Sequence, residues 1–364
     1  MISLLAGGCT LPGTNDGDSP VDNPDPYPYG SSEEIVDIGY SIYANVDGRI
    51  LQFDSDESDF YTVIATDINP DNPRFFITEA DSTKYVVFTR DENESGDDGH
   101  FIVVKNLDSD DNEIYLEKAT ASQNLTGEFV VRDGHVIYSD SGVLKDYDIA
   151  NPENVPVKIN ALLDEYECNH FINITSDGLL SFTEQDPSKN HGTIHVIPYD
   201  GTPQDVLSPS MPFYNYSFGA RFYPVTFSAD ALICLAEPTY ANTIFNYFDF
   251  EKGPTFTEIT CHDTDSVQFC KIYQTPGGTK TFLYGYNSVY WFDSADRPMS
   301  SDDFEVSGRD FSSTIRWITA TPDDAYIVLH DTYGIWVYDS NFDQVHCTFS
   351  WLNDENEVLW LDVK

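Results

Sequence analysis

Carboxylate side chains are densest in the segment Asp91–Asp98, which reads DENESGDD. Its first six residues match the start of a calcium-binding loop, in which oxygen ligands stand at alternate positions before a glycine. Such a loop also needs a bidentate acid at its twelfth position, and that position is Ile102. The segment therefore fits a hydrated turn between two strands as well as a calcium site. The candidate calcium ligands are Asp91, Asn93, Ser95 and Asp97, and the sequence implies no other cofactor.

Two histidines, His191 and His195, stand four residues apart in HGTIH. Residues four apart share a face in a strand as well as in a helix, so the pair meets one condition for a metal site. The glycine between them and the following Val-Ile-Pro favour a strand, and no glutamate completes a zinc-protease spacing. A G-x-S-x-G elbow is also absent. The sequence therefore assigns no catalytic residue.

Aromatic side chains gather in Pro212–Pro224, where they suit a ligand-binding loop on a rigid frame. Aromatic residues are also enriched in strands, so the same residues could fill a core. The candidate ligand-binding residues are Tyr214, Tyr216, Phe218 and Phe222.

Short strands and tight turns must position these residues. An apolar residue followed by Asp recurs seven times, at intervals of 40 to 54 residues, where a predicted strand ends. These pairs, here termed Asp tags, are Phe53-Asp54, Leu107-Asp108, Tyr147-Asp148, Tyr199-Asp200, Phe248-Asp249, Phe292-Asp293 and Tyr338-Asp339. Units of this length with about four short strands are typical of β-propeller blades. We therefore predict an all-β fold, a β-propeller over residues 35–364, with seven four-stranded blades favoured over six or eight.

Two segments carry a family resemblance. Tyr147–Ile159, YDIANPENVPVKI, resembles the V-D-V-S-N-P repeat of LVIVD-type bacterial surface propellers. Thr321–Tyr338 is similar to the S-P-D-G…I-x-V-Y-D unit of NHL-like and cytochrome-d1-like propellers. The resemblance implies architecture and assigns no functional residue.

The two ends of the propeller segment predict how its ring closes. The first unit offers the strands Val36–Tyr43, Ile50–Phe53 and Phe60–Thr66, and Glu357–Val363 remains unassigned after the last unit. A ring must join its first and last sheets or leave a strand edge exposed. We predict that Glu357–Val363 completes the first blade, the alternative being a terminal strand of the last one.

The N-terminus, MISLLAGGC, resembles a bacterial lipobox, which implies signal-peptide cleavage and acylation at Cys9. It departs from that pattern because no Lys or Arg precedes a short apolar run. Residues 10–34 are rich in Pro, Gly, Asp and Ser, which predicts a disordered tether. Together they indicate a lipoprotein of the bacterial envelope, in the outer membrane or at the cell surface, with the lipid as its only membrane contact.

The charge excludes one class of partner. The chain has 364 residues, with 62 Asp and Glu against 18 Lys and Arg, a formal net charge of −44. Such a field repels nucleic acid and favours a hydrated, monomeric protein.

Taken together, these features of the sequence favour a non-catalytic binding or scaffold lipoprotein that presents a propeller face to a protein or glycan. The alternative is an extracytoplasmic hydrolase, lyase or dehydrogenase with its site at the propeller axis.

Overall fold

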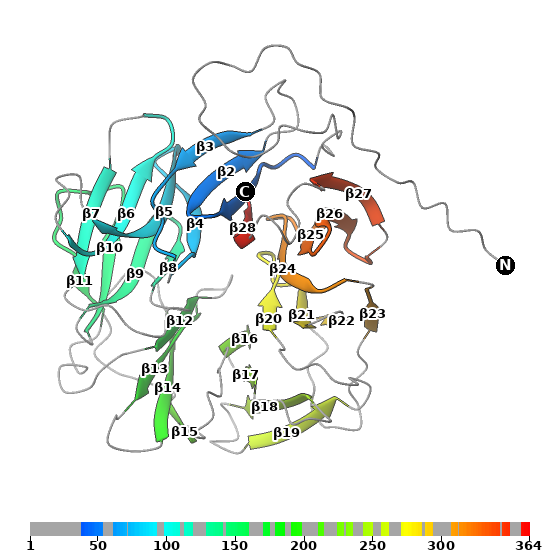
Figure 1. Ribbon diagram of the computed structural model, residues 1–364. Coiled ribbons are helices and arrows are strands. Elements are labelled where there is room, and N and C mark those ends of the chain that lie inside the picture. The colour runs from blue at the N-terminus through cyan, green and yellow to red at the C-terminus, as the bar shows by residue number, and fades with distance from the viewer. Residues whose placement is uncertain are drawn as a thin grey trace, which may run out of the picture.

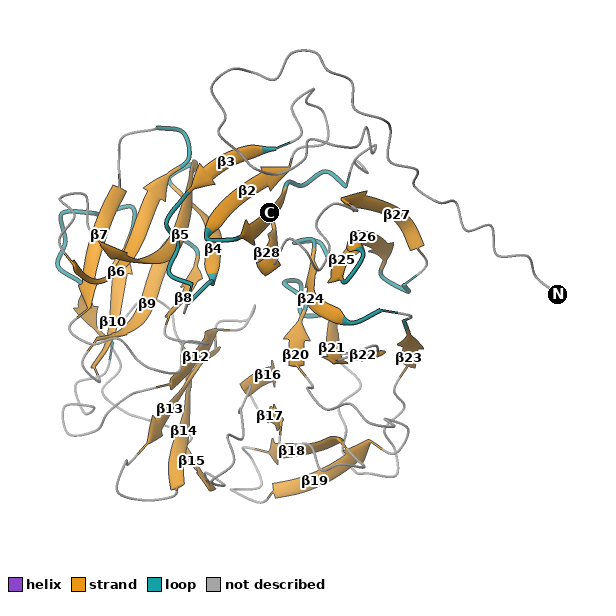
Figure 2. Ribbon diagram, in the orientation of Figure 1, coloured by secondary structure: helices purple, strands orange, loops and turns teal. Residues whose placement is uncertain are grey.

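Every regular element in the described part of the chain is a β-strand (Figure 2), as the abundance of Tyr, Phe and β-branched residues predicts. The computed structural model describes residues 38–53, 61–70, 72–92, 98–109, 113–118, 129–140, 143–159, 170–174, 179–185, 191–198, 210–214, 224–228, 231–235, 243–249, 256–261, 271–285, 288–293, 307–311, 313–342, 344–349 and 358–364. Within these ranges no helix has the length and apolar character needed to span a bilayer.

The described strands form seven antiparallel sheets of four strands each. The first sheet is β28 (Val358–Val363), β1 (Ile42–Val46), β2 (Arg49–Phe53) and β3 (Thr62–Ala65). The second and third sheets are β4 (Phe75–Ala80), β5 (Thr83–Glu92), β6 (Asp98–Asn106), β7 (Glu113–Lys118), and β8 (Phe129–Arg132), β9 (His135–Asp140), β10 (Val143–Asp148), β11 (Val157–Lys158). The fourth and fifth are β12 (His170–Ile174), β13 (Leu179–Gln185), β14 (His191–Pro198), β15 (Ser210–Tyr214), and β16 (Pro224–Ser228), β17 (Ala231–Leu235), β18 (Thr243–Asp249), β19 (Phe256–Cys261). The sixth and seventh are β20 (Lys271–Gln274), β21 (Lys280–Gly285), β22 (Ser288–Asp293), β23 (Ser307–Asp310), and β24 (Ile315–Ala320), β25 (Tyr326–Asp331), β26 (Gly334–Asp339), β27 (Gln344–Phe349).

All seven Asp tags fall at the end of the third strand of a sheet, either within it or directly after it. The apolar member is buried in Phe53, Tyr147 and Tyr338 and partly buried in Leu107. The acidic member starts the next turn. Asp148 Oδ1 accepts a hydrogen bond of 3.0 Å from the backbone nitrogen of Ala150, and Asp339 Oδ1 accepts one of 2.9 Å from the backbone nitrogen of Asn341. The tag recurs because each third strand ends with an apolar side chain and is followed by a turn, where Asp is favoured.

The ring closes through the last strand of the chain, as predicted. β28 pairs antiparallel with β1, with Ala44 opposite Leu361 and Ile42 opposite Val363. Ser41 and Lys364 exchange backbone hydrogen bonds of 2.9 and 3.1 Å at the end of this ladder. The first sheet therefore takes its edge strand from the opposite end of the sequence, which satisfies a β1 edge that would otherwise be unpaired.

One strand of each sheet lies closest to a common axis (Figure 1). These inner strands are β28, β4, β8, β12, β16, β20 and β24, and successive members contact each other along most of the ring. The core lies between neighbouring sheets: one apolar cluster joins the first and seventh, another the first and second. Radial sheets around an axis are the geometry expected of a propeller.

The antiparallel order gives the ring two distinct faces. All inner strands begin on one face, which also carries the turns from second to third strands and the connections from each outer strand to the next inner strand. This face is termed the connector face. The Asp tags end their strands at the opposite face.

A buried carboxylate ties the sixth and seventh sheets together on the opposite face. Asp324, 8% exposed, accepts hydrogen bonds from the Thr275 hydroxyl at 2.7 Å and the Gly277 backbone at 2.8 Å. It also accepts from both the backbone and the hydroxyl of Thr279, at 3.1 and 2.6 Å. Asp324 has a φ of 58°, a left-handed conformation that Asp adopts more readily than most residues. The β24–β25 turn of the seventh sheet thus holds the β20–β21 turn of the sixth sheet in place.

The predicted bounds of the first strand are wrong. Residues 38–41 carry no strand, and pairing begins at Ile42. The cause is tertiary, because the first strand extends only where β28 lies beside it. The predicted signal peptide, Cys9 and the tether at residues 10–34 lie outside the described residues.

Candidate functional site at the propeller axis

Aromatic side chains line the start of four consecutive inner strands. Trp317 is the third residue of β24, Trp360 the third of β28, Phe76 the second of β4, and Phe129 the first of β8. Neighbouring ring centroids are 4.9 Å apart for Trp317–Trp360, 6.4 Å for Trp360–Phe76 and 5.3 Å for Phe76–Phe129. Because inner strands begin on the connector face, these rings form a row along four neighbouring inner strands near that face. Trp317, Trp360 and Phe76, with Arg74, are termed the axial rim.

Arg74 adds a cation to the rim. Its guanidinium carbon lies 4.9 Å from the Trp360 ring centroid and 5.1 Å from that of Phe76. Both distances are within the range of cation–π attraction, which strengthens where water is partly excluded. Arg74 therefore fills the space between these two rings on the connector face.

The rim also has a structural role. Tyr273, the third residue of β20, accepts a hydrogen bond of 3.0 Å from the backbone of Ala320 in the next inner strand. The Trp317 indole donates one of 3.0 Å to the carbonyl of Val358, again in the next inner strand. An aromatic residue at this third position thus joins β20 to β24 and β24 to β28. Trp317, Trp360 and Phe76 are only partly buried, so each ring also keeps accessible surface.

Asp362 places a carboxyl group in the same wall, two residues after Trp360 on the same side of β28. Its Oδ1 accepts a hydrogen bond of 2.9 Å from the Val363 backbone, and its Oδ2 lies 3.5 Å from the backbone nitrogen of Ile77 in β4. Burial raises the pKa of Asp362, although the residue keeps part of its surface accessible. Asp362 thus adds a carboxyl group to the inner strand that carries Trp360.

An open cavity of about 900 Å³ lies beside the rim on the connector face. It is bounded by the β1–β2 turn, the connection from β3 to β4, and Leu359, the residue before Trp360. Its polar walls are Asp47, Arg49, Thr66 and Asp67. The volume is in the range of small-molecule sites, and the lining combines both charge signs with apolar side chains.

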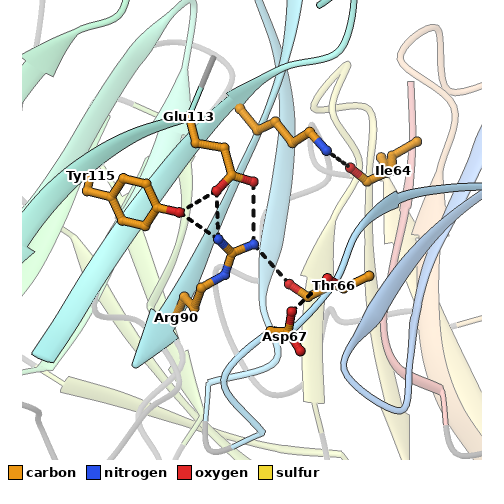
Figure 3. A network of polar contacts seen from close by, with 7 residues as sticks. Ile64, Thr66, Asp67, Arg90, Glu113 and Tyr115 are labelled. Carbon is orange, nitrogen blue, oxygen red and sulfur yellow. Dashed lines mark hydrogen bonds and ion pairs between the residues drawn. The ribbon is translucent and has the colours of Figure 1, made fainter. Parts of the chain in front are cut away.

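A polar network holds one wall of this cavity in place (Figure 3). Arg90 in β5 donates hydrogen bonds to Glu113 at 2.6 Å, to the Tyr115 hydroxyl at 2.7 Å and to the carbonyl of Thr66 at 3.0 Å. Lys105 donates to the carbonyl of Ile64 at 2.8 Å. Both carbonyls belong to β3 or its extension, the outer edge of the first sheet. Two cations of the second sheet therefore satisfy an edge that has no further strand.

The ionisation of the network follows from these contacts. Burial by itself would raise the pKa of Glu113, but the hydrogen bonds from Arg90 and Tyr115 and the charge of Arg90 outweigh it and lower the pKa. Burial and the hydrogen bond to Glu113 raise the pKa of Tyr115 to about 12. The ion pair and the neutral phenol are thus the stable forms, which suits a structural network.

The predicted calcium ligands are described only in part. Asp91 lies near the end of β5, where it accepts a hydrogen bond of 2.7 Å from Asn69 and lies 3.3 Å from His100 Nδ1. Strand pairing resumes at Glu92 opposite Asp98, so the segment joins two strands of one hairpin on the connector face. Asn93, Ser95 and Asp97 lie outside the described residues. Among the residues that are described, no group of three or more His, Cys, Asp or Glu could hold a metal ion.

The predicted aromatic ligand-binding residues are described even less. Tyr214 is the last residue of β15, and Tyr216, Phe218 and Phe222 lie outside the described residues. The flanking strands end and begin at the connector face, where the axial rim also lies. His191 and His195 are both in β14, a strand as expected.

Comparison of the sequence with known protein families and with curated proteins finds no match. Solved structures do resemble it. They include PorZ, a surface component of the type-IX secretion system of Porphyromonas gingivalis, with 9% identity and a TM-score of 0.52 over 85% of this chain and 37% of PorZ. A candidate 6-phosphogluconolactonase from Bacteroides fragilis has 12% identity and a TM-score of 0.50, over 89% of this chain and 98% of that one. A functionally unknown protein from Desulfotomaculum acetoxidans has 12% identity and a TM-score of 0.51, over 88% of this chain and 98% of that one. The chain is a β-propeller.

Sequence reasoning missed the axial rim of this propeller. The usable signal was an aromatic residue at the third position of β20, β24 and β28, namely Tyr273, Trp317 and Trp360. That regularity appears only after the strands are aligned as equivalent inner strands. At identities of 9 to 12%, the similar structures establish the fold and nothing about the site.

Proposed function

We propose that this β-propeller is a non-catalytic binding or scaffold module of the bacterial envelope, which presents its connector face and axial rim to a protein or glycan. The observation that carries the proposal is the axial rim: partly exposed Trp317, Trp360 and Phe76 converge from three sheets beside the Arg74 guanidinium. Partly exposed aromatic side chains are the strongest anchors in recognition sites, because they bury large areas at low entropic cost. The fold itself does not distinguish binding from catalysis.

The envelope location rests on the N-terminal sequence. Acylation at Cys9, followed by a tether over residues 10–34, would hold the propeller away from a membrane while leaving its connector face accessible. Cells that express the chain are grown with an alkyne-bearing fatty acid, and labelled proteins are detected. Label should enter the wild type and not Cys9→Ala; equal labelling of both would end the lipid-anchor proposal.

The binding role is tested by tryptophan fluorescence. The chain is titrated with soluble envelope glycan fragments and with peptides from envelope proteins. A saturable change should occur with one class and be lost in Trp360→Leu. Trp291→Leu is the matched control, because Trp291 is a partly buried tryptophan in β22, the third strand of its sheet, away from the axis. If no ligand of either class responds, or both variants behave alike, the axial binding role is wrong.

Asp362 supports a second candidate, an enzyme with its site at the axis. A carboxyl group whose pKa is raised by burial keeps its proton to a higher pH than a free carboxyl group, which is a property of general acids. Ligands that bind are therefore recovered and examined by mass spectrometry. Unchanged ligand supports the binding role, whereas a chemical change that disappears in Asp362→Asn supports the enzyme.

A further inference from the structure

The rim offers a ligand two apolar plates set at an angle. The Trp317 and Trp360 rings are tilted by 55° with centroids 4.9 Å apart, and neither is fully buried. Indole rings combine an apolar face with a fixed orientation, because packing leaves them few rotamers. A ligand that rests here needs an apolar face of its own.

Polar groups stand on either side of the rings. The Asp362 carboxyl lies two residues along β28 from Trp360, and each of its oxygens accepts at most one backbone hydrogen bond within the described residues. A carboxylate oxygen has two lone pairs, so Asp362 retains capacity to accept hydrogen bonds. The Arg74 guanidinium carbon lies 4.9 Å from the Trp360 ring centroid. A ligand held by the rings would therefore need hydroxyl or amide groups along its edge.

The charges restrict the ligand further. The net charge of −44 repels polyanions. A cationic side chain on Trp360 would meet Arg74, whose guanidinium carbon is 4.9 Å from the centroid of that ring and 5.1 Å from that of Phe76. Like charges at such separations repel even when partly screened. Both arguments favour a neutral ligand.

Resting on the proposed binding role, we propose that the axial rim binds a neutral sugar ring of a glycan, with the ring's apolar face against Trp317 and Trp360 and its hydroxyl groups directed to Asp362. A pyranose has this chemistry, since its C–H bonds form an apolar face and its hydroxyl groups lie around the edge. A single sugar ring makes only a few contacts with these side chains, so the affinity is expected to be low. A dissociation constant in the micromolar to millimolar range is expected, on the order of that for small ligands with few anchors.

The test measures binding of neutral oligosaccharides, the same oligosaccharides carrying uronic acid, and neutral peptides of similar mass, by saturation-transfer NMR and tryptophan fluorescence. Neutral oligosaccharides should bind, with magnetisation transfer strongest at ring C–H protons. Asp362→Asn keeps the size of the side chain and should weaken binding about tenfold, as expected for loss of a hydrogen bond to a charged acceptor. Asp293→Asn makes the same change at an exposed carboxylate at the end of β22, on the face opposite the connector face, and is the matched control that should leave binding unchanged.

The outcomes separate the ligand class from the binding role. If peptides bind in a Trp360-dependent manner and oligosaccharides do not, the sugar inference is overturned while the binding role stands. If uronic-acid oligosaccharides bind more tightly than neutral ones, the charge argument is wrong. If Asp362→Asn leaves sugar affinity unchanged, the proposed hydroxyl contact is wrong, and if no class binds at the rim, both proposals fail.

Discussion

Closure of the ring by β28 makes a quantitative prediction about two leucines in that strand. Leu361 is 4% exposed and packs in the cluster between the first and seventh sheets, with Val328 and Val337. Leu359 is only partly buried and lines the open cavity. Leu361→Ala should lower the free energy of unfolding by about 3 kcal/mol, because it removes buried methyl groups and leaves a cavity. Leu359→Ala should cost about 1 kcal/mol, since part of its side chain already contacts water.

Urea unfolding followed by circular dichroism measures the difference, with the slope m compared to confirm that the same surface unfolds. A loss of about 3 kcal/mol is a large share of the 5–15 kcal/mol typical of folded proteins, so the midpoint should shift clearly. Equal costs for the two variants, or a greater cost for Leu359→Ala, would refute the reasoning. Either result would mean that β28 does not occupy the first sheet in this register, because a shift of two residues would bring Leu359 to the position opposite Ala44 that Leu361 now holds.

Three further predictions follow from buried polar contacts. Asp324→Asn should lower the free energy of unfolding in urea by about 2 kcal/mol, because the amide nitrogen cannot accept the hydrogen bonds that one carboxylate oxygen now receives. An unchanged midpoint would mean that Asp324 does not stabilise the contact between the sixth and seventh sheets. Arg90→Met should lower the free energy of unfolding by about 2 kcal/mol, and adding Glu113→Gln should restore part of this loss, because the second change removes the carboxylate left without its ion-pair partner. If the losses from the two single variants simply add, Arg90 and Glu113 are not energetically coupled. The hydrogen bond to Asp146, 3.1 Å away, raises the pKa of His135, so the pair stabilises the fold below about pH 6.5 and this contribution of about 0.5–1 kcal/mol is lost as pH rises through the raised pKa. Asp146→Asn should remove that pH dependence, and an NMR titration of His135 gives the pKa directly.

The local sequence was sufficient for the strands, the turns and their period. Each Asp tag combines an apolar residue at the end of a strand with an Asp at the start of a turn, where Asp148 and Asp339 accept hydrogen bonds from the backbone, and both preferences act within a few residues. The unassigned strand predicted at Glu357–Val363 also indicated closure, because an open ring would leave an edge unpaired, and β28 pairs with β1. The first strand was placed too early because its start depends on β28, which the neighbouring sequence cannot reveal.

The sequence by itself determined that this protein is built from repeated antiparallel sheets closed into a ring. Only the tertiary structure decided which residues meet at the axis. Phe76, Trp317 and Trp360 lie near opposite ends of the chain, and they become neighbours because the inner strands run side by side around one axis. Alternation in a strand shows which residues share a face, but the partner of that face depends on the ring as a whole. The candidate site therefore lay beyond sequence reasoning, although the frame that carries it did not.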